Sequence, residues 1–205
     1  MRARDKDLSG YYVWFDTEFT SLDIRQARLL QVAMVVTDAR LQRVGAPNQD
    51  VNLVINLAPD TACDPWVARN LAGLVKRSRG GEGVAETAAD ALLAARLDEL
   101  LGAAPAKIAR RPVLAGNSLQ ADWQLAERYL PQFFSRLNYR VLDVSSLKVH
   151  LRNRAKRFAF DKDDKALLRR TFPGEFNSTA ADHDAHFDVL ASIAELHFYD
   201  QALAL

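Results

Sequence analysis

Two acidic side chains, Asp16 and Glu18, directly follow a run of bulky apolar residues from Tyr11 to Phe15. Such a run is typical of a buried β-strand, and side chains two positions apart in a strand point to the same face. The two carboxylates would therefore stand side by side and repel each other. A divalent cation would offset that repulsion, because hard cations take oxygen ligands.

Three further side chains could take part in the same chemistry. Asp122 begins a predicted helix after a Gly-Asn-Ser turn, and Asp188 lies in the C-terminal helix five residues after His183. Two metal ions held by converging carboxylates can bind both the attacking and the leaving oxygen of a phosphoryl displacement. Such a site also needs a base for the attacking water, and histidine titrates near neutral pH.

Each of these residues also has an ordinary explanation when it is taken alone. An Asp-x-Glu sequence is common, and an acid such as Asp122 is favoured at a helix N-terminus by capping and by the helix dipole. His183 and Asp188 could be a helix cap and a surface charge. The metal-site hypothesis therefore depends on the ordered set rather than on any one member.

The elements that would position these side chains alternate between strand and helix after an initial run of strands. Apolar alternation and helical periodicity predict strands over 11–19, 28–38, 50–57, 112–118 and 139–142, and helices over 84–101, 121–134, 143–154 and 183–205. Pro131 should stop or bend the helix predicted over 121–134. Strands followed by alternating strands and helices predict an α/β protein with a mixed sheet flanked by helices.

The composition sets limits on the class of protein. The 205 residues are 49% hydrophobic and 26% charged, so we expect one globular domain over 1–205. A net charge of +1 argues against a polycationic protein that coats DNA. Cys63 is the only cysteine, which excludes a disulfide framework within the chain and an all-cysteine zinc site, and a reducing cytoplasm fits. The apolar run after the N-terminus is too short for a signal peptide or a membrane span.

The ordered set resembles the DEDDh 3′–5′ exonucleases, and within them the oligoribonucleases. The segments that carry the resemblance are VWFDTEFTSLD, AGNSLQADWQLAERYLPQF, YRVLDVSSLK and HDAHFDVLASIAELHFY, which together extend over most of the chain. The resemblance implies an RNase H-like fold, two Mg²⁺ or Mn²⁺ ions, and removal of 3′-terminal nucleotides from very short RNA as nucleoside 5′-monophosphates. It also implies that Asp16, Glu18, Asp122 and Asp188 bind the metals and that His183 is the base.

The same resemblance implies a set of residues that bind the substrate. Leu22 would be a wedge beside the bases, and Trp66 would line the pocket. Ser118 and Ser145 would approach the terminal 5′ phosphate. Tyr139 and Arg140 would reach into the partner's site of a homodimer.

The chain departs from the family pattern at three places, and the last two of these departures leave the substrate length open. Ser21 stands where a glycine is usual, and no histidine follows shortly after Trp66, where Asn70 and Leu71 stand. The interval from Lys148 to His183 is longer than usual. It contains the basic residues Arg152, Arg154, Lys156, Arg157, Lys162, Lys165, Arg169 and Arg170.

This basic segment, 152–170, is either a solvated charged face or a flap that holds phosphate backbone. The alternative function is accordingly a broader DEDDh exonuclease that acts on longer single-stranded DNA or RNA. A catalytically silent nucleic-acid-binding module usually lacks a metal ligand or the base. All five positions are present here, which favours an enzyme.

Overall fold

The structure, a computed structural model, describes residues 6–155, 158–178 and 183–204. Within these residues five strands form one sheet in the order β3-β2-β1-β4-β5. The strands are β1 (Tyr11–Phe19), β2 (Leu29–Asp38), β3 (Val51–Val54), β4 (Val113–Gly116) and β5 (Val141–Asp143). β1, β2 and β3 pair antiparallel, whereas β4 runs parallel to both β1 and β5. The predicted mixed sheet is therefore confirmed.

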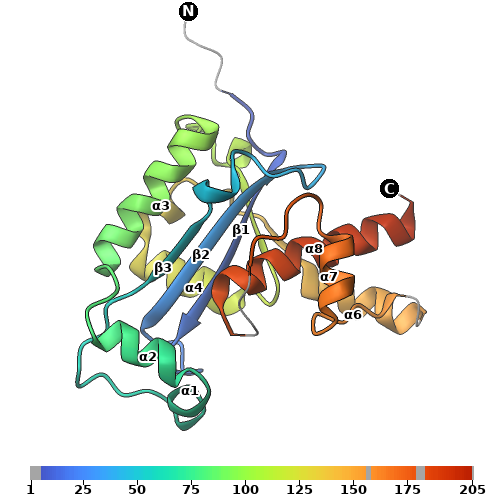
Figure 1. The fold of residues 1–205 in the computed structure, drawn as a ribbon. Helices are drawn as coiled ribbons and strands as arrows, with labels where there is room; N and C mark the ends of the chain where they lie inside the picture. Colours follow the sequence, from blue (N-terminus) through green and yellow to red (C-terminus); the bar gives the residue numbers. More distant parts are fainter. Residues whose placement is uncertain (1–5, 156–157, 179–182, 205) are drawn as a thin grey trace, which may run out of the picture.

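Helices cover both faces of this sheet (Figure 1). The helices of one face, α3, α4 and α5, bury their apolar residues in one cluster with β1 and β2, and α6, α7 and α8 form a second cluster on the other face. Their bounds are α3 (Glu86–Leu101), α4 (Gln120–Tyr129), α5 (Pro131–Phe134), α6 (Val144–Arg154), α7 (Lys165–Thr171) and α8 (Ala185–Leu203). Two short helices, α1 (Pro65–Asn70) and α2 (Ala72–Arg79), lie beyond one end of the sheet (Figure 1). Single 3-10 turns occupy Pro47–Gln49 and Ile108–Arg110.

The central strand β1 separates the two apolar clusters by the alternation of its side chains. Phe15 belongs to the cluster under α3 and α4, and Trp14 belongs to the cluster under α8. Side chains alternate between the two faces of a strand. Asp16 and Glu18 therefore continue the Trp14 face, towards α8, and Thr17 continues the Phe15 face, towards α4.

Several boundaries differ from the expected ones. Strand β3 ends at Val54 rather than at residue 57, because Ile55 pairs with Val84 in an isolated bridge. The strand expected from Tyr139 begins only at Val141. Pro131 does stop the preceding helix, since α4 ends at Tyr129 and Pro131 occupies the first turn of α5, where a missing N–H costs nothing.

In the part of the chain that the structure describes, three α-helices lie in regions where the sequence indicated none. α1 and α2 follow the third strand, and α7 lies inside the polar stretch that looked like a loop. Asp164 caps α7 by accepting hydrogen bonds from the backbone N–H groups of Ala166 and Leu167, and Leu168 is fully buried. No helix among the described residues is long and apolar enough to cross a membrane.

Candidate active site

Three carboxylates converge where the C-terminal end of β1 meets the first turn of α8. Oxygens of Asp16, Glu18 and Asp188 all lie within 4.8 Å of one another. The two β1 residues share a face because of the strand's alternation, and α8 packs on that same face. A group of this geometry provides the oxygen ligands that a hard divalent cation prefers.

The electrostatics of the three carboxylates also fit a bound cation. Burial, followed by the charges of Asp122, Asp188 and Glu18, raises the pKa of Asp16 well above its usual value. Burial and the charge of Asp188 raise the pKa of Glu18 to about 8. Both causes disfavour the charged form, and a divalent cation would reverse them.

Asp122 approaches from the other side of β1. It lies in the first turn of α4 and is 5% exposed, and its Oδ1 accepts a 2.6 Å hydrogen bond from Thr17 Oγ1. Burial raises the pKa of Asp122 to about 6, while the Thr17 hydrogen bond acts in the opposite direction. Asp122 is outside the tightest group of three, but its charge acts on Asp16. The fourth predicted carboxylate is thus in electrostatic contact with the group.

His183 precedes α8 and is exposed. Its φ of 64° lies in the left-handed region, which is uncommon for a residue with a side chain. The residue that caps α8 is the next one, Asp184, whose Oδ1 accepts from Phe187 N and whose Oδ2 accepts from Gln31 Nε2. Gln31 of β2 therefore holds the start of α8, and with it His183 and Asp188, against the sheet.

An exposed apolar rim lies beside the acidic group. Trp66 of α1 is 50% exposed, and its ring contacts the His183 ring edge-on at 4.9 Å between centroids. Leu22 is 84% exposed, and its backbone N–H donates to Asp64 Oδ2 at 3.0 Å. This contact ties the loop after β1 to the start of α1, so Leu22 and Trp66 come from neighbouring segments.

The two residues in place of the expected histidine make a local hydrogen bond and a buried apolar contact. Asn70 donates to the backbone oxygen of Trp66 at 2.8 Å, and Leu71 is buried.

The two serines that are distant in sequence meet in the structure. Ser118 Oγ lies 3.1 Å from Ser145 Oγ, and Asp143 Oδ1 accepts from the backbone N–H groups of both residues. Ser145 Oγ also donates to Asn117 Oδ1 at 3.0 Å. The pair lies where the turn after β4 meets the start of α6.

A hydrogen-bonded chain joins this serine pair to the helix that carries Asp188. Asn117 Nδ2 donates to Ser192 Oγ at 3.0 Å and to Glu195 Oε2 at 3.1 Å. Ser192 Oγ in turn donates to the backbone oxygen of Asp188. Asn117 was not among the predicted site residues, although its place in the Gly-Asn-Ser turn was a signal that could have identified it.

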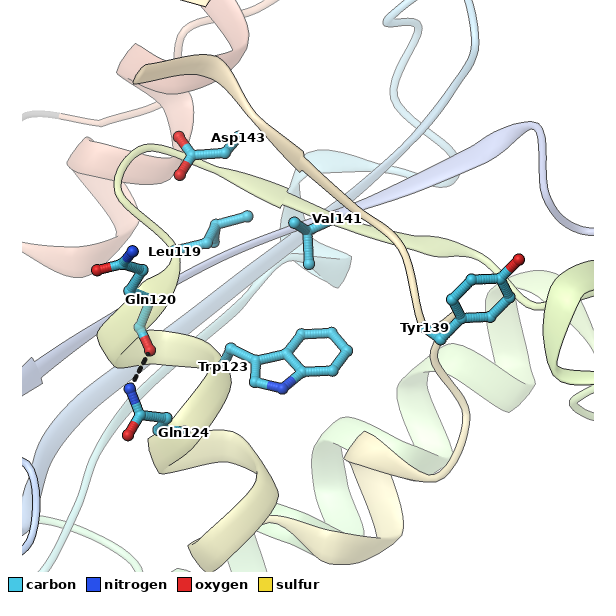
Figure 2. Close-up of a pocket in the computed structure, with 7 residues that line it drawn as sticks. All are labelled: Leu119, Gln120, Trp123, Gln124, Tyr139, Val141 and Asp143. Atoms are coloured by element: carbon cyan, nitrogen blue, oxygen red, sulfur yellow. Dashed lines mark hydrogen bonds between the residues drawn. The ribbon is translucent and has the colours of Figure 1, made fainter. Parts of the chain in front are cut away.

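Tyr139 lines a cavity of about 670 Å³ between α4 and the edge strand β5, and Arg140 follows it in the chain. Figure 2 shows the Trp123 indole projecting from α4 towards Val141 and Tyr139. Tyr139 is 58% exposed, and the Arg140 guanidinium lies 4.4 Å from the centroid of its ring. The cavity is lined by Leu119, Gln120, Trp123, Gln124, Tyr139, Val141 and Asp143.

Among the described residues of the basic segment 152–170, Lys162 reaches the acidic group. Lys162 Nζ lies 3.1 Å from Asp188 Oδ1, and its charge also acts on Asp16 and Glu18. The exposed members of the segment on α6 and α7 are Arg152, Arg154, Lys165, Arg169 and Arg170. Lys156 and Arg157 lie outside the described residues. The segment is thus more than a solvated charged face, and the sequence had not singled out Lys162.

Comparison with known proteins places the chain among nucleases. A family model described as exonuclease, RNase_T, matches residues 13–196. The oligoribonuclease of Leifsonia xyli is 32% identical over 203 residues, which cover 95% of this chain and 84% of that protein. The mitochondrial oligoribonuclease of Bos taurus is 29% identical and covers 96% of this chain and 75% of that protein.

Solved structures support the same fold. Exonuclease I of E. coli, in a zinc-bound complex with single-stranded DNA, matches with a TM-score of 0.65 and 16% identity over 96% of this chain. A product-bound exonuclease I matches with a TM-score of 0.63 and 14% identity over 94% of this chain. This chain spans only 41% and 44% of those two chains. At these identities the likeness concerns the RNase H-like fold alone.

Proposed function

The chain belongs to the RNase_T exonuclease family, and on that premise we propose that it is a metal-dependent 3′–5′ exoribonuclease that degrades very short RNA. The observation that carries the proposal is the convergence of Asp16, Glu18 and Asp188 within 4.8 Å at the end of β1. The similarity to oligoribonucleases over nearly the whole chain supports short RNA as the substrate. The family match also supports the expectation that residues 1–205 act as one exonuclease domain.

The site would hold two divalent ions, Mg²⁺ or Mn²⁺. Asp16, Glu18 and Asp188, with Asp122 beside them, would hold these ions. When bound, the ions supply positive charge that stabilises the attacking and leaving oxygens of the displacement.

The protein's own groups would position the water and the substrate. His183 would take a proton from the water, which attacks the 3′-terminal phosphodiester in line. The bond from phosphorus to the 3′ oxygen of the preceding nucleotide then breaks. A nucleoside 5′-monophosphate leaves the site, and the shortened chain keeps a 3′-hydroxyl.

Substrate length would depend on two surfaces beside the acidic group. Leu22 and Trp66 form an exposed apolar rim on which a base can stack. Ser118 and Ser145, which meet through Asp143, offer hydroxyl and backbone donors for a 5′ phosphate. A phosphate held there would favour a 5′-phosphorylated dinucleotide over a longer chain.

The broader alternative is an exonuclease that acts on longer single-stranded DNA or RNA. Lys162 and the exposed arginines of α6 and α7 favour it, since they could follow a phosphate backbone beyond the first linkage. These arginines are Arg152, Arg154, Arg169 and Arg170. The single-stranded DNA bound to E. coli exonuclease I in its complex is consistent with this alternative.

Timed digestion of end-labelled RNAs from two to twenty nucleotides long, beside matched DNAs, tests the proposal. We expect 5′-phosphorylated RNA dinucleotides to be degraded fastest and their 5′-hydroxyl forms more slowly. Equal rates for dinucleotides and decamers at equal concentration would contradict the short-substrate proposal and favour the alternative.

We also propose a homodimer. Val141 is exposed on the edge strand β5, and Tyr139 is exposed in the segment just before that strand. Trp123 of α4 lies beside both residues (Figure 2). An isologous interface would cover this apolar edge and bring Tyr139 and Arg140 to the partner's site.

For the compartment we keep the prediction of a reducing cytoplasm, since Cys63 is the only cysteine.

A further inference from the structure

Lys162 occupies a defined position over the acidic group. Its Nζ donates to Asp188 Oδ1 at 3.1 Å, and 43% of its side chain is exposed. The side chain thus contacts the group of carboxylates and remains partly open to solvent.

The segment that carries Lys162 is anchored on both sides of it. Before it, Phe158 is buried in the cluster around α8, and the Phe160 ring packs against Phe198 at 5.5 Å between centroids. After it, Asp164 caps α7, which buries Leu168 in the same cluster. The backbone at residue 162 is thus held by packing that does not involve the carboxylates. It would stay in place when metal ions enter the site.

The charge of the site changes when metal and substrate bind. Four carboxylates and two divalent ions have equal and opposite formal charges. The phosphodiester then adds a negative charge, and attack by a deprotonated water adds another. A cation on a flexible four-carbon stem beside this position can stabilise that charge.

Resting on the proposed exonuclease function, we propose that Lys162 is a further catalytic residue that contacts the substrate. In the metal-loaded site its ammonium leaves Asp188 and donates a hydrogen bond to a non-bridging oxygen of the scissile phosphate. Lys162 stays protonated throughout. The water gives a proton to His183, and its oxygen forms a bond to phosphorus as the bond from phosphorus to the 3′ oxygen breaks. The 3′ oxygen takes a proton from solvent, and His183 returns its proton to solvent.

The competing explanation is that Lys162 only neutralises the carboxylates in the absence of metal. The two explanations differ at saturating metal. A counter-cation would have no effect on turnover there, and its removal would only tighten metal binding. A phosphate ligand would affect turnover and the binding of phosphate-containing ligands at the same metal concentration.

The experiment compares Lys162→Ala and Lys162→Arg with Lys165→Ala in the full chain. Lys165 lies on the same segment, but its Nζ is placed 3.9 Å from the centroid of the Phe187 ring. At saturating Mg²⁺ we expect Lys162→Ala to lower kcat by roughly 10–100-fold, somewhat less than loss of a buried oxyanion donor. Lys162→Arg should recover part of the loss, and Lys165→Ala should remain close to the unchanged protein.

A binding measurement provides a readout other than activity. Calorimetric titration of the Mg²⁺-loaded protein with adenosine 5′-monophosphate should show weaker binding in Lys162→Ala and not in Lys165→Ala. Titration with Mg²⁺ alone should show unchanged or tighter metal binding. Unchanged kcat together with unchanged adenosine 5′-monophosphate affinity in Lys162→Ala would overturn the assignment and leave the counter-cation explanation.

Thymidine 5′-p-nitrophenyl phosphate, a phosphodiester with a coloured leaving group, separates this inference from the proposed substrate class. If the unchanged protein hydrolyses it but not short RNA, the short-RNA proposal fails, and the Lys162 variants still decide the role of Lys162. If the unchanged protein degrades short RNA and Lys162→Ala does so equally fast, the Lys162 inference alone fails. If neither compound is hydrolysed, the adenosine 5′-monophosphate titration decides.

Discussion

Thr17 donates a 2.6 Å hydrogen bond to Asp122, although its side chain lies on the opposite face of β1 from Asp16 and Glu18. The strand therefore supplies two carboxylates from one face and positions a third, on α4, from the other. The hydrogen bond engages Oδ1 of Asp122. This single side-chain contact links the metal-site geometry to the packing between β1 and α4.

Replacement of Thr17 by Val keeps the shape of the side chain and removes the hydroxyl. We expect the free energy of unfolding to fall by about 1–3 kcal/mol, because a buried carboxyl loses its partner. The Mg²⁺ affinity should fall as well, as Asp122 becomes less well oriented. Calorimetry and thermal unfolding check both effects.

Thr37→Val is the matched control for that variant. Thr37 is also buried, and its hydroxyl accepts from Trp14 Nε1 at 2.9 Å. The Thr37→Val variant should have a lower free energy of unfolding than the unchanged protein and the same Mg²⁺ affinity. If both variants keep the Mg²⁺ affinity of the unchanged protein, Thr17 does not orient a metal ligand.

Asp16→Asn should remove most activity, since a neutral amide is a poorer ligand for a divalent cation than a carboxylate. The metal-free protein should unfold at the same temperature or higher, because the substitution removes a buried carboxyl whose ionisation is opposed by burial and by three neighbouring carboxylates. The rise in Tm that Mg²⁺ produces should be lost. Asp60→Asn, at an exposed position, is the control. Near-normal turnover of Asp16→Asn in Mg²⁺ would contradict the metal-ligand assignment.

His183→Ala should lower kcat by roughly 10²–10⁴-fold, the range for a positioned acid–base group. Metal binding should remain, because the carboxylates are unchanged. His150→Ala, an exposed histidine on α6, should retain full activity. Loss of Mg²⁺ binding in His183→Ala, seen by calorimetry, would instead make His183 a ligand.

The raised pKa of Glu18 predicts how the stability of the metal-free protein depends on pH. Glu18 has a pKa of about 8 in the folded protein and 4.5 as its ordinary value, so the folded state holds the proton more tightly. The stabilisation from this group is complete below pH 4.5 and is lost as pH rises towards 8. Without metal, Tm should therefore fall over this window.

Saturating Mg²⁺ should abolish that fall, because metal replaces the proton on the carboxylates. Glu18→Gln without metal should show a flatter profile than the unchanged protein. A Tm of the metal-free protein that rises between pH 5 and pH 8 would contradict the assignment of Glu18 as a carboxyl that is protonated in the metal-free site.

Sedimentation should show a dimer that Val141→Lys disrupts. Val141 is an exposed apolar residue of the edge strand β5, and a lysine there opposes pairing of two edges. Leu92→Lys replaces an exposed leucine on α3 and should leave the dimer intact. If Arg140 serves the partner's site, Arg140→Ala should slow dinucleotides more than decamers. An active monomer at working concentration would refute the proposed dimer.

The sequence by itself determined those features that depend on neighbours along the chain. The period of two in a strand placed Asp16 and Glu18 on one face, and the missing N–H of Pro131 ended α4 before it. The sheet class followed from the order of apolar segments. The ordered acidic motifs, together with their resemblance to the DEDDh exonucleases, indicated the family that the comparisons confirm.

Only the tertiary structure decided which distant residues meet. Thr17 contacts Asp122, Ser118 contacts Ser145, and Lys162 contacts Asp188. None of these pairs follows from local periodicity. In each pair the two residues are far apart in the sequence, and they meet only because the elements that carry them pack together around the sheet. Lys162 is the clearest case. In the sequence its charge is one of many in a basic segment. In the structure, the burial of Phe158 and Leu168 on either side of it positions Lys162 next to the carboxylates.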